Sequence, residues 1–426
     1  MSRRSRSPVE LTRRDWARLI GASSAAAAVS ACGDNRGASD LVAAVFDPTP
    51  TALLVAIWSP DATEVEVEIS TGEELVTIET VELGTGGTGI IDITGLVPDH
   101  AYEIVVGSGA TRFGPCRART APSDTATAPV RLAISADFDP DPMFDSDLID
   151  HVLAADPQLY ISLGDFPYTD NGPIARTVAE YRARHADLRT APAARRLIES
   201  VGIRAIYDDH EFRNDWDSAR AATEAGRYTA AMQVWDEFFP VRGAVADVRY
   251  RSWRWGANLE CFLLDCRRFR SSNAAVDDAA KTMLGATQLA WLLEGVRQST
   301  ATFKLILTSV PLDFGEGVDH WAGFTTERGH LLDAMVGVTG VLFVCADQHY
   351  FAAHRHAHGV REFQVGPLAR GVFAPGPVAP GVLFRSHQFN AGLLDVSSDR
   401  IVMWGLGADG ERFYEETLTV ENLTPA

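Results

Sequence analysis

The chain has 426 residues, of which 46% are hydrophobic and 22% are charged, as in an ordinary globular protein and unlike a disordered one. This length allows two domains with a large buried core. The formal net charge of −19 argues against a nucleic-acid-binding surface, because phosphate backbones require a basic face. An anionic substrate would therefore need local neutralisation by arginine or by bound metal.

Residues 1–31 are expected to form an export signal. Several arginines precede the apolar stretch Leu19 to Ala31, which is too short to span a bilayer. The segment Thr12 to Arg18 resembles a twin-arginine signal, and Val29-Ser30-Ala31-Cys32 resembles a lipobox, in which the cysteine is lipidated. The alternative is a plain signal peptide with a chance cysteine. We expect a periplasmic or extracellular lipoprotein that Cys32 anchors to a membrane.

After a linker at 32–39, residues 40–121 are expected to form an all-β sandwich domain. Alternating apolar and polar residues, as in Val65 to Ile69, are typical of half-buried strands. The segment Leu96 to Tyr102 resembles the tyrosine corner of fibronectin-type or immunoglobulin-like sandwiches. Residues 122–129, rich in Pro, Thr and Ala, predict a second linker.

Residues 130–426 are expected to form one α/β domain, because short apolar runs alternate with helical patterns. The predicted helices include Val178–Ser200 and Gln288–Gln298. The apolar runs are Val130–Ser135, Leu159–Leu163, Ile203–Tyr207, Leu259–Leu264, Phe303–Leu307 and Val341–Cys345.

Most of these apolar runs end in charged or metal-ligating residues. The five segments are Asp137-Phe138-Asp139, Gly164-Asp165-Phe166-Pro167-Tyr168, Asp208-Asp209-His210-Glu211, Asp265-Cys266-Arg267-Arg268-Phe269-Arg270 and Asp347-Gln348-His349. Any one of them could be a turn or a solvated surface. Together they predict one site, because ligand sites of α/β proteins form where the carboxyl ends of strands converge.

The residue types at these ends predict a metal centre. Carboxylates and a phenolate are hard oxygen ligands and imidazole is a borderline nitrogen ligand, a mixture that suits Fe, Mn, Zn or Ca. Two cations about 3.5–4 Å apart can polarise a phosphoryl oxygen and activate a bridging water. Arginines at the rim would recognise phosphate oxygens. The chemistry indicated is hydrolysis of a phosphate ester.

Several of these segments resemble the PhoD-type alkaline phosphatase and phosphodiesterase family of the calcineurin-like metallophosphoesterases. Gly164-Asp165 with Tyr168 matches the family's GDxxY motif, and Asp208 to Glu211 followed by Asn214 matches its DDHE motif. Leu264-Asp265 with Arg267 and Arg270 matches LDxRxxR, Thr282 to Leu292 matches TMLGxxQxxWL, and Asp319 to Gly323 matches DxWxG. The closing GDxH motif appears as Ala346-Asp347-Gln348-His349.

The resemblance implies a core of two packed mixed sheets flanked by helices, with an N-terminal fibronectin-like or immunoglobulin-like sandwich. It implies hydrolysis by a metal-activated hydroxide, with Fe and Ca as the expected metals and Mn or Zn as alternatives. His210 would act near the leaving group and Arg267 would contact the phosphate. The implied metal-site residues are Asp137, Asp165, Tyr168, Asp209, Asn214, Asp347 and His349.

The sequence departs from the family pattern at Ala136, where the family has a cysteine that binds iron. An alanine side chain cannot be a ligand. Asp137 is the proposed substitute, and Asp139 would then stand where the related superfamily has a histidine. The second departure, Ala346 for glycine, is milder.

The expected substrate is a small-molecule phosphate monoester. One alternative is a phosphodiesterase with phospholipase D-like activity, and another is a non-catalytic, surface-binding lipoprotein with a degenerate metal site. A separate feature is the alternation of His354, His356 and His358, which on a strand would share one face. Such a run is more often a solvated strand or loop than a metal site.

Overall fold

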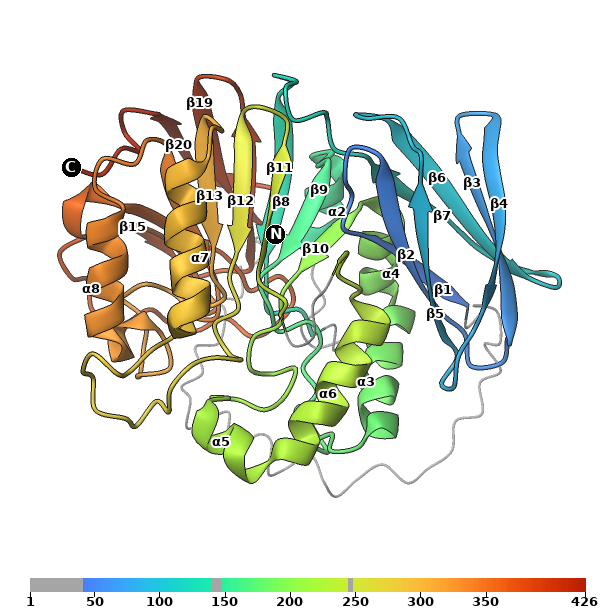
Figure 1. Cartoon of the computed structure of the whole chain (residues 1–426), viewed down its shortest axis with the longest axis horizontal. Helices are drawn as coiled ribbons and strands as arrows, with labels where there is room; N and C mark the ends of the chain where they lie inside the picture. The colour runs from blue at the N-terminus through green and yellow to red at the C-terminus, as the bar shows by residue number, and fades with distance from the viewer. Residues whose placement is uncertain (1–40, 140–146, 244–247) are drawn as a thin grey trace, which may run out of the picture.

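The computed structural model of the chain describes residues 41–139, 147–243 and 248–426. Two large sheets pack face to face at its centre, helices cover their outer faces, and a third sheet lies at one end (Figure 1). The predicted fold class is confirmed. The predicted export signal and Cys32 lie outside the described residues, and no helix in the described part is long and apolar enough to cross a membrane.

The first large sheet has nine strands and runs from the C-terminal hairpins to the N-terminal strands. In spatial order these are β20 (Arg412–Thr419), β19 (Arg400–Gly407), β18 (Asn390–Val396), β8 (Val130–Ser135), β9 (Leu159–Ser162), β10 (Ile203–Ala205), β1 (Val42–Phe46), β2 (Ala52–Trp58) and β5 (Thr88–Thr94). The central strands β8, β9 and β10 are parallel, so their carboxyl ends share one edge.

The second large sheet has seven strands, and β12, β13, β14 and β16 within it are parallel. In spatial order the strands are β11 (Arg251–Trp255), β12 (Leu259–Leu263), β13 (Phe303–Leu307), β14 (Val341–Cys345), β16 (Arg361–Gln364), β15 (Phe351–Arg355) and β17 (Val382–Ser386).

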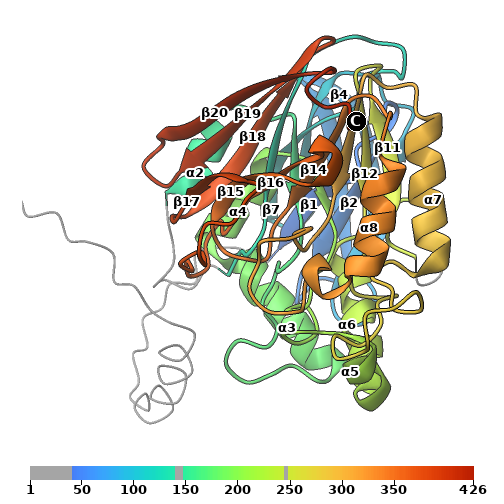
Figure 2. The same ribbon diagram turned by 90° about the vertical axis from the view of Figure 1, so that its left-hand side faces the viewer.

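Helices lie on both outer faces of the sheet pair. Figure 2 shows α7 (Gly285–Gln298) and α8 (Thr325–Ala334) along one side of the molecule and β18 to β20 on the opposite side. The helices packed on the nine-stranded sheet and its loops are α2 (Leu148–Ala154), α3 (Val178–Thr190), α4 (Pro192–Ser200), α5 (Ser218–Thr223) and α6 (Ala225–Phe238). Short 3-10 turns cover Trp321–Gly323 (η1) and Ala357–Gly359 (η2).

The central strands have continuous apolar sequences because both of their faces are buried. In β12, Leu259, Cys261 and Leu263 face the core between the sheets. Phe262 faces the layer formed by α7 and α8. Alternation of side chains along the strand therefore fills two cores at once.

The helical stretch predicted over Val178–Ser200 is present, but it forms two helices that are separated at Ala191. Ala191 is extended (φ −64°, ψ 131°), and Pro192 begins α4. Proline disfavours the helical conformation for the residue before it and lacks the N–H of a helix interior, but it suits a first helical position.

The N-terminal region is a β-sandwich whose own sheet contains four strands. These are β4 (Glu74–Glu82), β3 (Glu64–Thr71), β6 (Ala101–Ser108) and β7 (Thr111–Arg119). The tyrosine corner is present, since the Tyr102 hydroxyl accepts a hydrogen bond of 2.9 Å from the Val97 N–H.

The sandwich shares a sheet with the rest of the molecule. β1 pairs in parallel with β10, and the Asp47 N–H donates to the Ile203 carbonyl at 3.0 Å. Beside this junction the buried Asp47 carboxylate pairs with Arg204 at 3.1 Å and with Arg251 at 3.2 Å. Backbone pairing thus joins the two regions on either side of the domain boundary predicted at residues 122–129. That boundary stays a prediction.

Candidate metal centre

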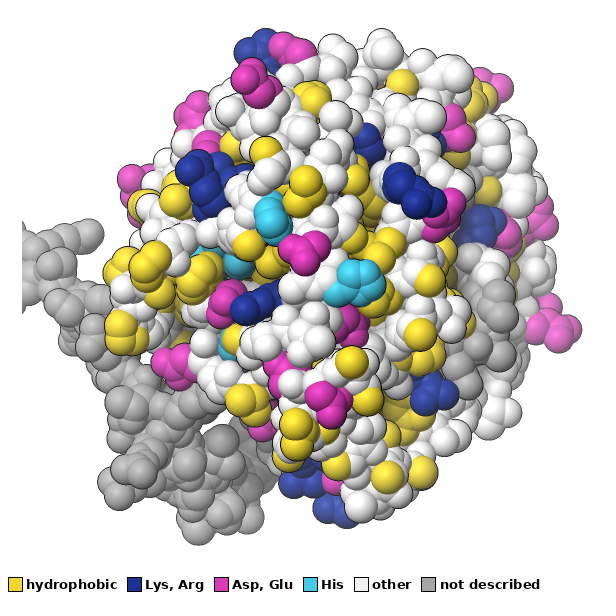
Figure 3. Space-filling model, turned by 60° about the vertical axis from the view of Figure 1, so that its left-hand side comes forward, with side chains coloured by type: hydrophobic (Ala, Val, Ile, Leu, Met, Phe, Trp, Pro, Cys, Tyr) yellow, Lys and Arg dark blue, Asp and Glu magenta, His cyan; other side chains and the backbone are white. Residues whose placement is uncertain are grey.

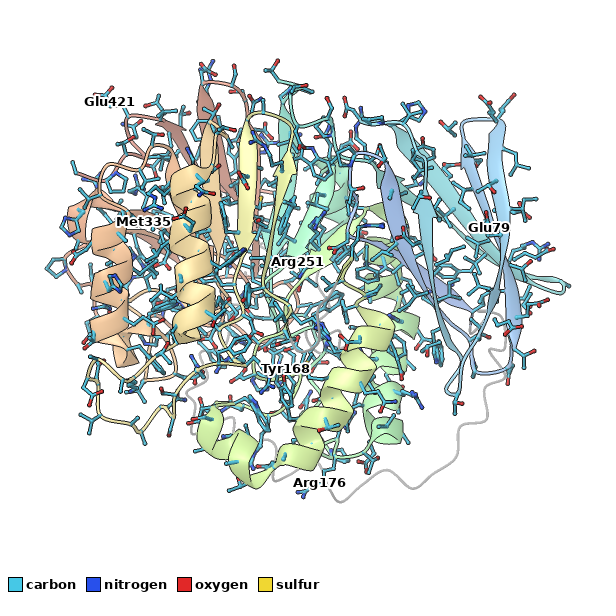
Figure 4. The ribbon with its side chains drawn as sticks, viewed as in Figure 1. Glu79, Tyr168, Arg176, Arg251, Met335 and Glu421 are labelled. Atoms are coloured by element: carbon cyan, nitrogen blue, oxygen red, sulfur yellow. The ribbon has the colours of Figure 1, made fainter. Side chains whose placement is uncertain are left out.

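The loops that follow β8, β9, β10 and β14 converge at one edge of the paired sheets. Tyr168, in the loop after β9, lies below the strands in Figure 4. Around it, buried carboxylates and imidazoles form several groups whose potential ligand atoms lie within 4.8 Å of one another. Most of the residues predicted from the sequence to form a site are therefore neighbours in space.

One group consists of Asp137, Asp165 and His349. The Tyr168 hydroxyl lies 3.1 Å from His349 Nε2, and Asp137 Oδ1 lies 3.6 Å from the same nitrogen. His349 Nδ1 donates to the Gly371 carbonyl. A carbonyl can only accept, so Nδ1 carries the proton and Nε2 presents its lone pair to the group.

Two further groups adjoin the first. One contains Asp165, Asp209 and His210, and the other contains Asp208, Asp209 and Asp347. Asp165 and Asp209 each belong to two of these groups, so the geometry suits adjacent cations that share carboxylate ligands. Asp209 also lies in a more exposed group with Asp215 and Asp319.

Some carboxylate oxygens of the centre are buried and accept no hydrogen bond within the described part of the chain. Both oxygens of Asp137 and Oδ1 of Asp209 accept no hydrogen bond from any described residue. An isolated buried carboxylate costs several kcal/mol or more unless a cation or proton neutralises it. Oxygen and imidazole donors arranged in this way fit metal ions.

The pKa values of the same groups are displaced in the direction that crowding predicts. Burial, reinforced by the charge of Asp208, raises the pKa of Asp137 well above its usual value. Burial likewise raises the pKa of Asp165 and Asp347. For Asp209, burial raises the pKa to about 6 although Arg267 and His210 oppose the shift. A bound cation would reverse this effect, because it favours the ionised carboxylate.

The backbone at the centre has an unusual conformation. Asp137 (φ 58°), Asp165 (φ 55°), Asp347 (φ 76°) and His349 (φ 58°) all lie in the left-handed region. Non-glycine residues visit this region rarely and at a cost, and such residues concentrate at functional sites. Each of these residues follows a strand end, so the turn redirects its side chain from the sheet to the centre.

Gly164 is required by close packing. Its φ is +115°, and a Cβ at this position would lie 2.4 Å from the Asp208 Cβ. The glycine in the GDxxY motif therefore allows the loops after β9 and β10 to touch.

His210 is held at the centre by a neighbouring acid. Its Nδ1 lies 2.7 Å from Asp170 Oδ1, and its Nε2 faces Asp165 at 4.0 Å. Burial lowers the pKa of His210, but the carboxylates of Asp170, Asp165 and Asp209 together raise it well above the usual value. The ring also packs on Tyr168, with 4.3 Å between ring centroids.

Arg267 lies fully buried in a network of carboxylates. Its Nε and Nη2 each donate to Asp208 at 2.6 Å, and its Nη1 donates to Asp319 at 2.7 Å. Arg270 donates to the other oxygen of Asp319 at 2.7 Å. Each nitrogen of Arg267 thus has a protein acceptor, and Nη1 and Nη2 each carry a second N–H. The contact of Arg267 with a substrate phosphate stays a prediction.

Two residues named from the sequence have other contacts. Asn214 is exposed, and its main-chain N–H donates to Asp170 at 2.8 Å. The Asp139 carboxylate pairs with Arg370 at 2.9 Å and with Asn171 at 2.6 Å, and it lies outside the ligand groups. Asn214 as a metal-site residue stays a prediction.

Three further residues support the centre without belonging to the proposed ligand set. Glu211 accepts from the Phe166 N–H at 2.7 Å and the Asp208 N–H at 2.9 Å, which ties two loops together. Asp170 holds His210, and Gln288 on α7 bonds both backbone groups of Asp265, at 2.8 and 2.9 Å. Glu211 and Gln288 each carried a sequence signal, because they lie in the DDHE and TMLGxxQxxWL matches, whereas Asp170 carried none.

Two packed sheets with carboxylate and imidazole groups at their strand ends are the architecture of a metallophosphoesterase. A family model described as PhoD-like phosphatase matches residues 147–391, more than half of the chain. The chain belongs to the PhoD-like phosphatase family, and the resemblance seen in its motifs is confirmed.

Individual relatives agree with this assignment. Alkaline phosphatase D of Bacillus subtilis (strain 168) is 25% identical over 235 residues, which cover 47% of this chain and 40% of that protein. The match thus spans well under two thirds of the curated relative's length.

Solved structures show the same fold. A structure of PhoD superimposes with a TM-score of 0.78 at 18% identity, covering 91% of this chain and 90% of that one. Purple acid phosphatase PPD1 from yellow lupin (Lupinus luteus) seeds gives a TM-score of 0.65 at 12% identity, covering 91% and 75%. At these identities the likeness concerns the fold alone.

Proposed function

We propose that this protein is a metal-dependent phosphoric ester hydrolase. Family membership supports the reaction class. The observation that carries the metal dependence is the set of three adjoining ligand groups, in which Asp165 links the first to the second and Asp209 links the second to the third. Both buried oxygens of Asp137 also accept no hydrogen bond from any described residue. Metals bound there would polarise the phosphoryl oxygens and lower the pKa of a water molecule.

The proposed metal-site residues are those of the converging loops. Asp137 takes the part that the family cysteine plays elsewhere, so the ligand atoms are oxygens and imidazole nitrogens rather than a thiolate. Iron with calcium is the proposed metal content, and manganese or zinc is the alternative. The full set is Asp137, Asp165, Tyr168, Asp209, Asp347 and His349, with Asn214 as a weaker member.

His210 is proposed to protonate the leaving alcohol. Asp170 accepts from Nδ1, which orients the ring and leaves Nε2 directed toward the centre. A proton held at Nε2 can pass to the departing oxygen, which is the role of a general acid. The arrangement resembles other histidines whose working nitrogen is set by a carboxylate on the opposite nitrogen.

Arg267 is proposed to act on the substrate phosphate while remaining bonded to Asp208. Its guanidinium lies 3.6 Å from Asp209 and 3.8 Å from Asp347, so it borders the ligand groups. A positive charge in that position favours the negative charge that accumulates on phosphoryl oxygens in the transition state.

Elemental analysis together with one substitution tests this proposal. We expect the purified full chain to contain metal and to hydrolyse an aryl phosphate. We expect Asp209→Asn to lose metal and activity. Asp61→Asn, which changes an exposed acid of the sandwich that belongs to no ligand group, should keep both. Metal-free protein without hydrolysis under Fe, Ca, Mn and Zn supplementation would overturn the proposal in favour of a non-catalytic surface-binding protein.

The substrate class is proposed to be a phosphate monoester. Turnover of an aryl phosphate is to be compared with that of the corresponding bis-aryl diester at equal concentrations. A higher kcat/KM for the monoester is expected. A strong preference for the diester would instead assign a phosphodiesterase, including one that acts on phospholipids.

Export and lipidation are proposed from residues 1–32 alone. We expect Cys32→Ala to abolish incorporation of a labelled fatty acid and to release the protein from the membrane fraction. Unchanged membrane association of this variant would show that the lipobox resemblance is accidental.

A further inference from the structure

A second group of metal-ligating side chains lies outside the candidate metal centre. It consists of His354 on β15, His356 just after it and Glu362 on β16, and their ligand atoms lie within 4.8 Å of one another. Antiparallel pairing places His354 directly opposite Glu362. In Figure 1, β15 lies at the end of the molecule opposite the sandwich. No residue of this group belongs to the groups at the candidate metal centre.

The group is not the solvated face that alternating histidines usually form. The side chains of His354, His356 and Glu362 are 0%, 3% and 0% exposed. His358 is different, because it is partly exposed and pairs with Asp333 at 2.8 Å. The buried set therefore combines two histidines from the alternation with a glutamate from the next strand.

Glu362 is a buried carboxylate whose neighbours of possible positive charge are two histidines. Its Oε2 lies 2.8 Å from His356 Nε2 and 3.3 Å from His354 Nδ1. Within residues 41–139, 147–243 and 248–426, no lysine or arginine forms an ion pair with it. Burying a carboxylate without a cation is costly, so either a shared proton or a metal ion must balance it.

The histidine tautomers permit a metal. His354 Nε2 is buried and has no hydrogen-bond partner among the described residues. Among these residues, Nε2 makes no hydrogen bond that would require it to be unprotonated. The proton of His354 can therefore lie on Nε2, and Nδ1 can then present its lone pair to the group. Two imidazoles and one carboxylate form a typical ligand set for zinc.

The spacing also suits zinc. Zinc–ligand distances of about 2.0–2.1 Å in a tetrahedral site place neighbouring ligand atoms about 3.3 Å apart. The two nitrogen–oxygen distances of 2.8 and 3.3 Å are close to that value. We propose that His354, His356 and Glu362 bind a zinc ion, at a site separate from the candidate metal centre.

This site would fasten a loop that reaches the candidate metal centre. The other oxygen of Glu362 accepts from the Leu312 N–H at 2.8 Å, and the Phe314 ring stacks on His356 with 5.4 Å between centroids. The same loop continues to Asp319, which binds Arg267. Because metal binding favours the folded form, zinc here stabilises that loop.

Zinc titration of the purified full chain tests the proposal. Wild type is expected to bind one more zinc equivalent per chain than His356→Gln, and zinc is expected to raise the unfolding temperature of wild type. His358→Gln is the matched control, because this neighbouring histidine lies outside the group and should leave zinc binding unchanged. Asp209→Asn, which alters the candidate metal centre, should also retain this zinc.

Anomalous diffraction at the zinc edge, measured on crystals of the wild-type protein, is a second test. It does not depend on whether the His356→Gln variant folds. A peak between the two imidazoles and Glu362 is the expected result. Equal zinc content in wild type and His356→Gln, or no anomalous peak at this position after zinc soaking, would show that a shared proton balances Glu362 and would overturn the proposal.

Discussion

Asp137 shows how a shift of one residue along a strand changes the chemistry of a site. Ala136 continues the alternation of β8 and packs in the core between the sheets. Asp137 adopts a left-handed backbone, and its carboxylate instead reaches His349. The buried acid therefore stands beside the remaining ligands although the preceding residue cannot bind metal. Loss of the family cysteine alone does not imply a decayed site.

The Asp137→Ala substitution should remove this ligand. We expect metal affinity and kcat to fall by more than about 100-fold, because losing an outer partner alone typically costs 10–100-fold. Metal content and turnover of the purified variant are the measurements. Asp139→Asn is the control, since Asp139 pairs with Arg370 and lies outside the ligand groups. Wild-type metal content in Asp137→Ala would exclude Asp137 as a ligand.

At the scale of elements, α7 positions the end of β12. Gln288 accepts from the Asp265 N–H and donates to the Asp265 carbonyl, both at buried positions. Asp265 in turn accepts from the N–H groups of Arg267 and Arg268, at 3.0 and 2.8 Å. A helix that contributes no ligand thus sets the turn from which Arg267 reaches the centre.

Replacing Gln288 by alanine should loosen this turn. The two backbone groups of Asp265 would be left buried without partners, which we expect to reduce the free energy of unfolding by about 2–4 kcal/mol. Urea unfolding measures this, and kcat should fall as well because Arg267 is less firmly placed. Gln298→Ala, at the exposed end of the same helix, should change stability by less than about 0.5 kcal/mol. Equal effects of the two substitutions would contradict this role.

The sequence predicts the strands and the set of converging residues well, because both follow from local patterns. Runs buried on two faces indicate β8, β9 and β14, and the acids that follow each of them within three residues indicate the centre. The partners of Arg267 were not predictable. Asp208 and Asp319 lie 59 and 52 residues away, and only the packing of two sheets brings them together. The join between β1 and β10 was missed for the same reason.

At the scale of the whole molecule, a buried ion network holds the sandwich to the core. Asp47, after β1, pairs with Arg204 on β10 and Arg251 on β11, and it also accepts from the Arg242 N–H at 3.0 Å. Burial raises the pKa of Asp47, but Arg251, Arg204 and the Arg242 N–H lower it more, so the net pKa lies below the usual value. The carboxylate is therefore ionised in the folded protein and stabilises it.

Asp47→Asn should leave two buried guanidinium groups without their carboxylate and reduce the free energy of unfolding by about 3–5 kcal/mol at neutral pH. Since the folded pKa is lowered, this stabilisation is complete above the unfolded pKa of about 3.9 and is lost as the pH falls through the folded value. The difference between wild type and variant should thus narrow below about pH 4.

Urea unfolding of both proteins between pH 7 and pH 3 measures this narrowing. Asp92→Asn removes a half-exposed partner of Arg242 and should cost no more than about 1 kcal/mol. A difference for Asp47→Asn that stays constant across this pH range would show that the Asp47 carboxylate does not titrate with the expected shift.

The shared nine-stranded sheet determines how substrate can approach. A sandwich joined to the core by a flexible linker could move as a lid, but here any such hinge would break the pairing of β1 with β10 and the buried ion pairs of Asp47. We therefore expect the sandwich to keep its position relative to the core. Figure 3 shows a face on which basic side chains are scattered among acidic, histidine and hydrophobic ones. We therefore expect admission and release of substrate to depend on the loops at the strand ends, and selectivity for large or small esters to change with those loops rather than with the sandwich.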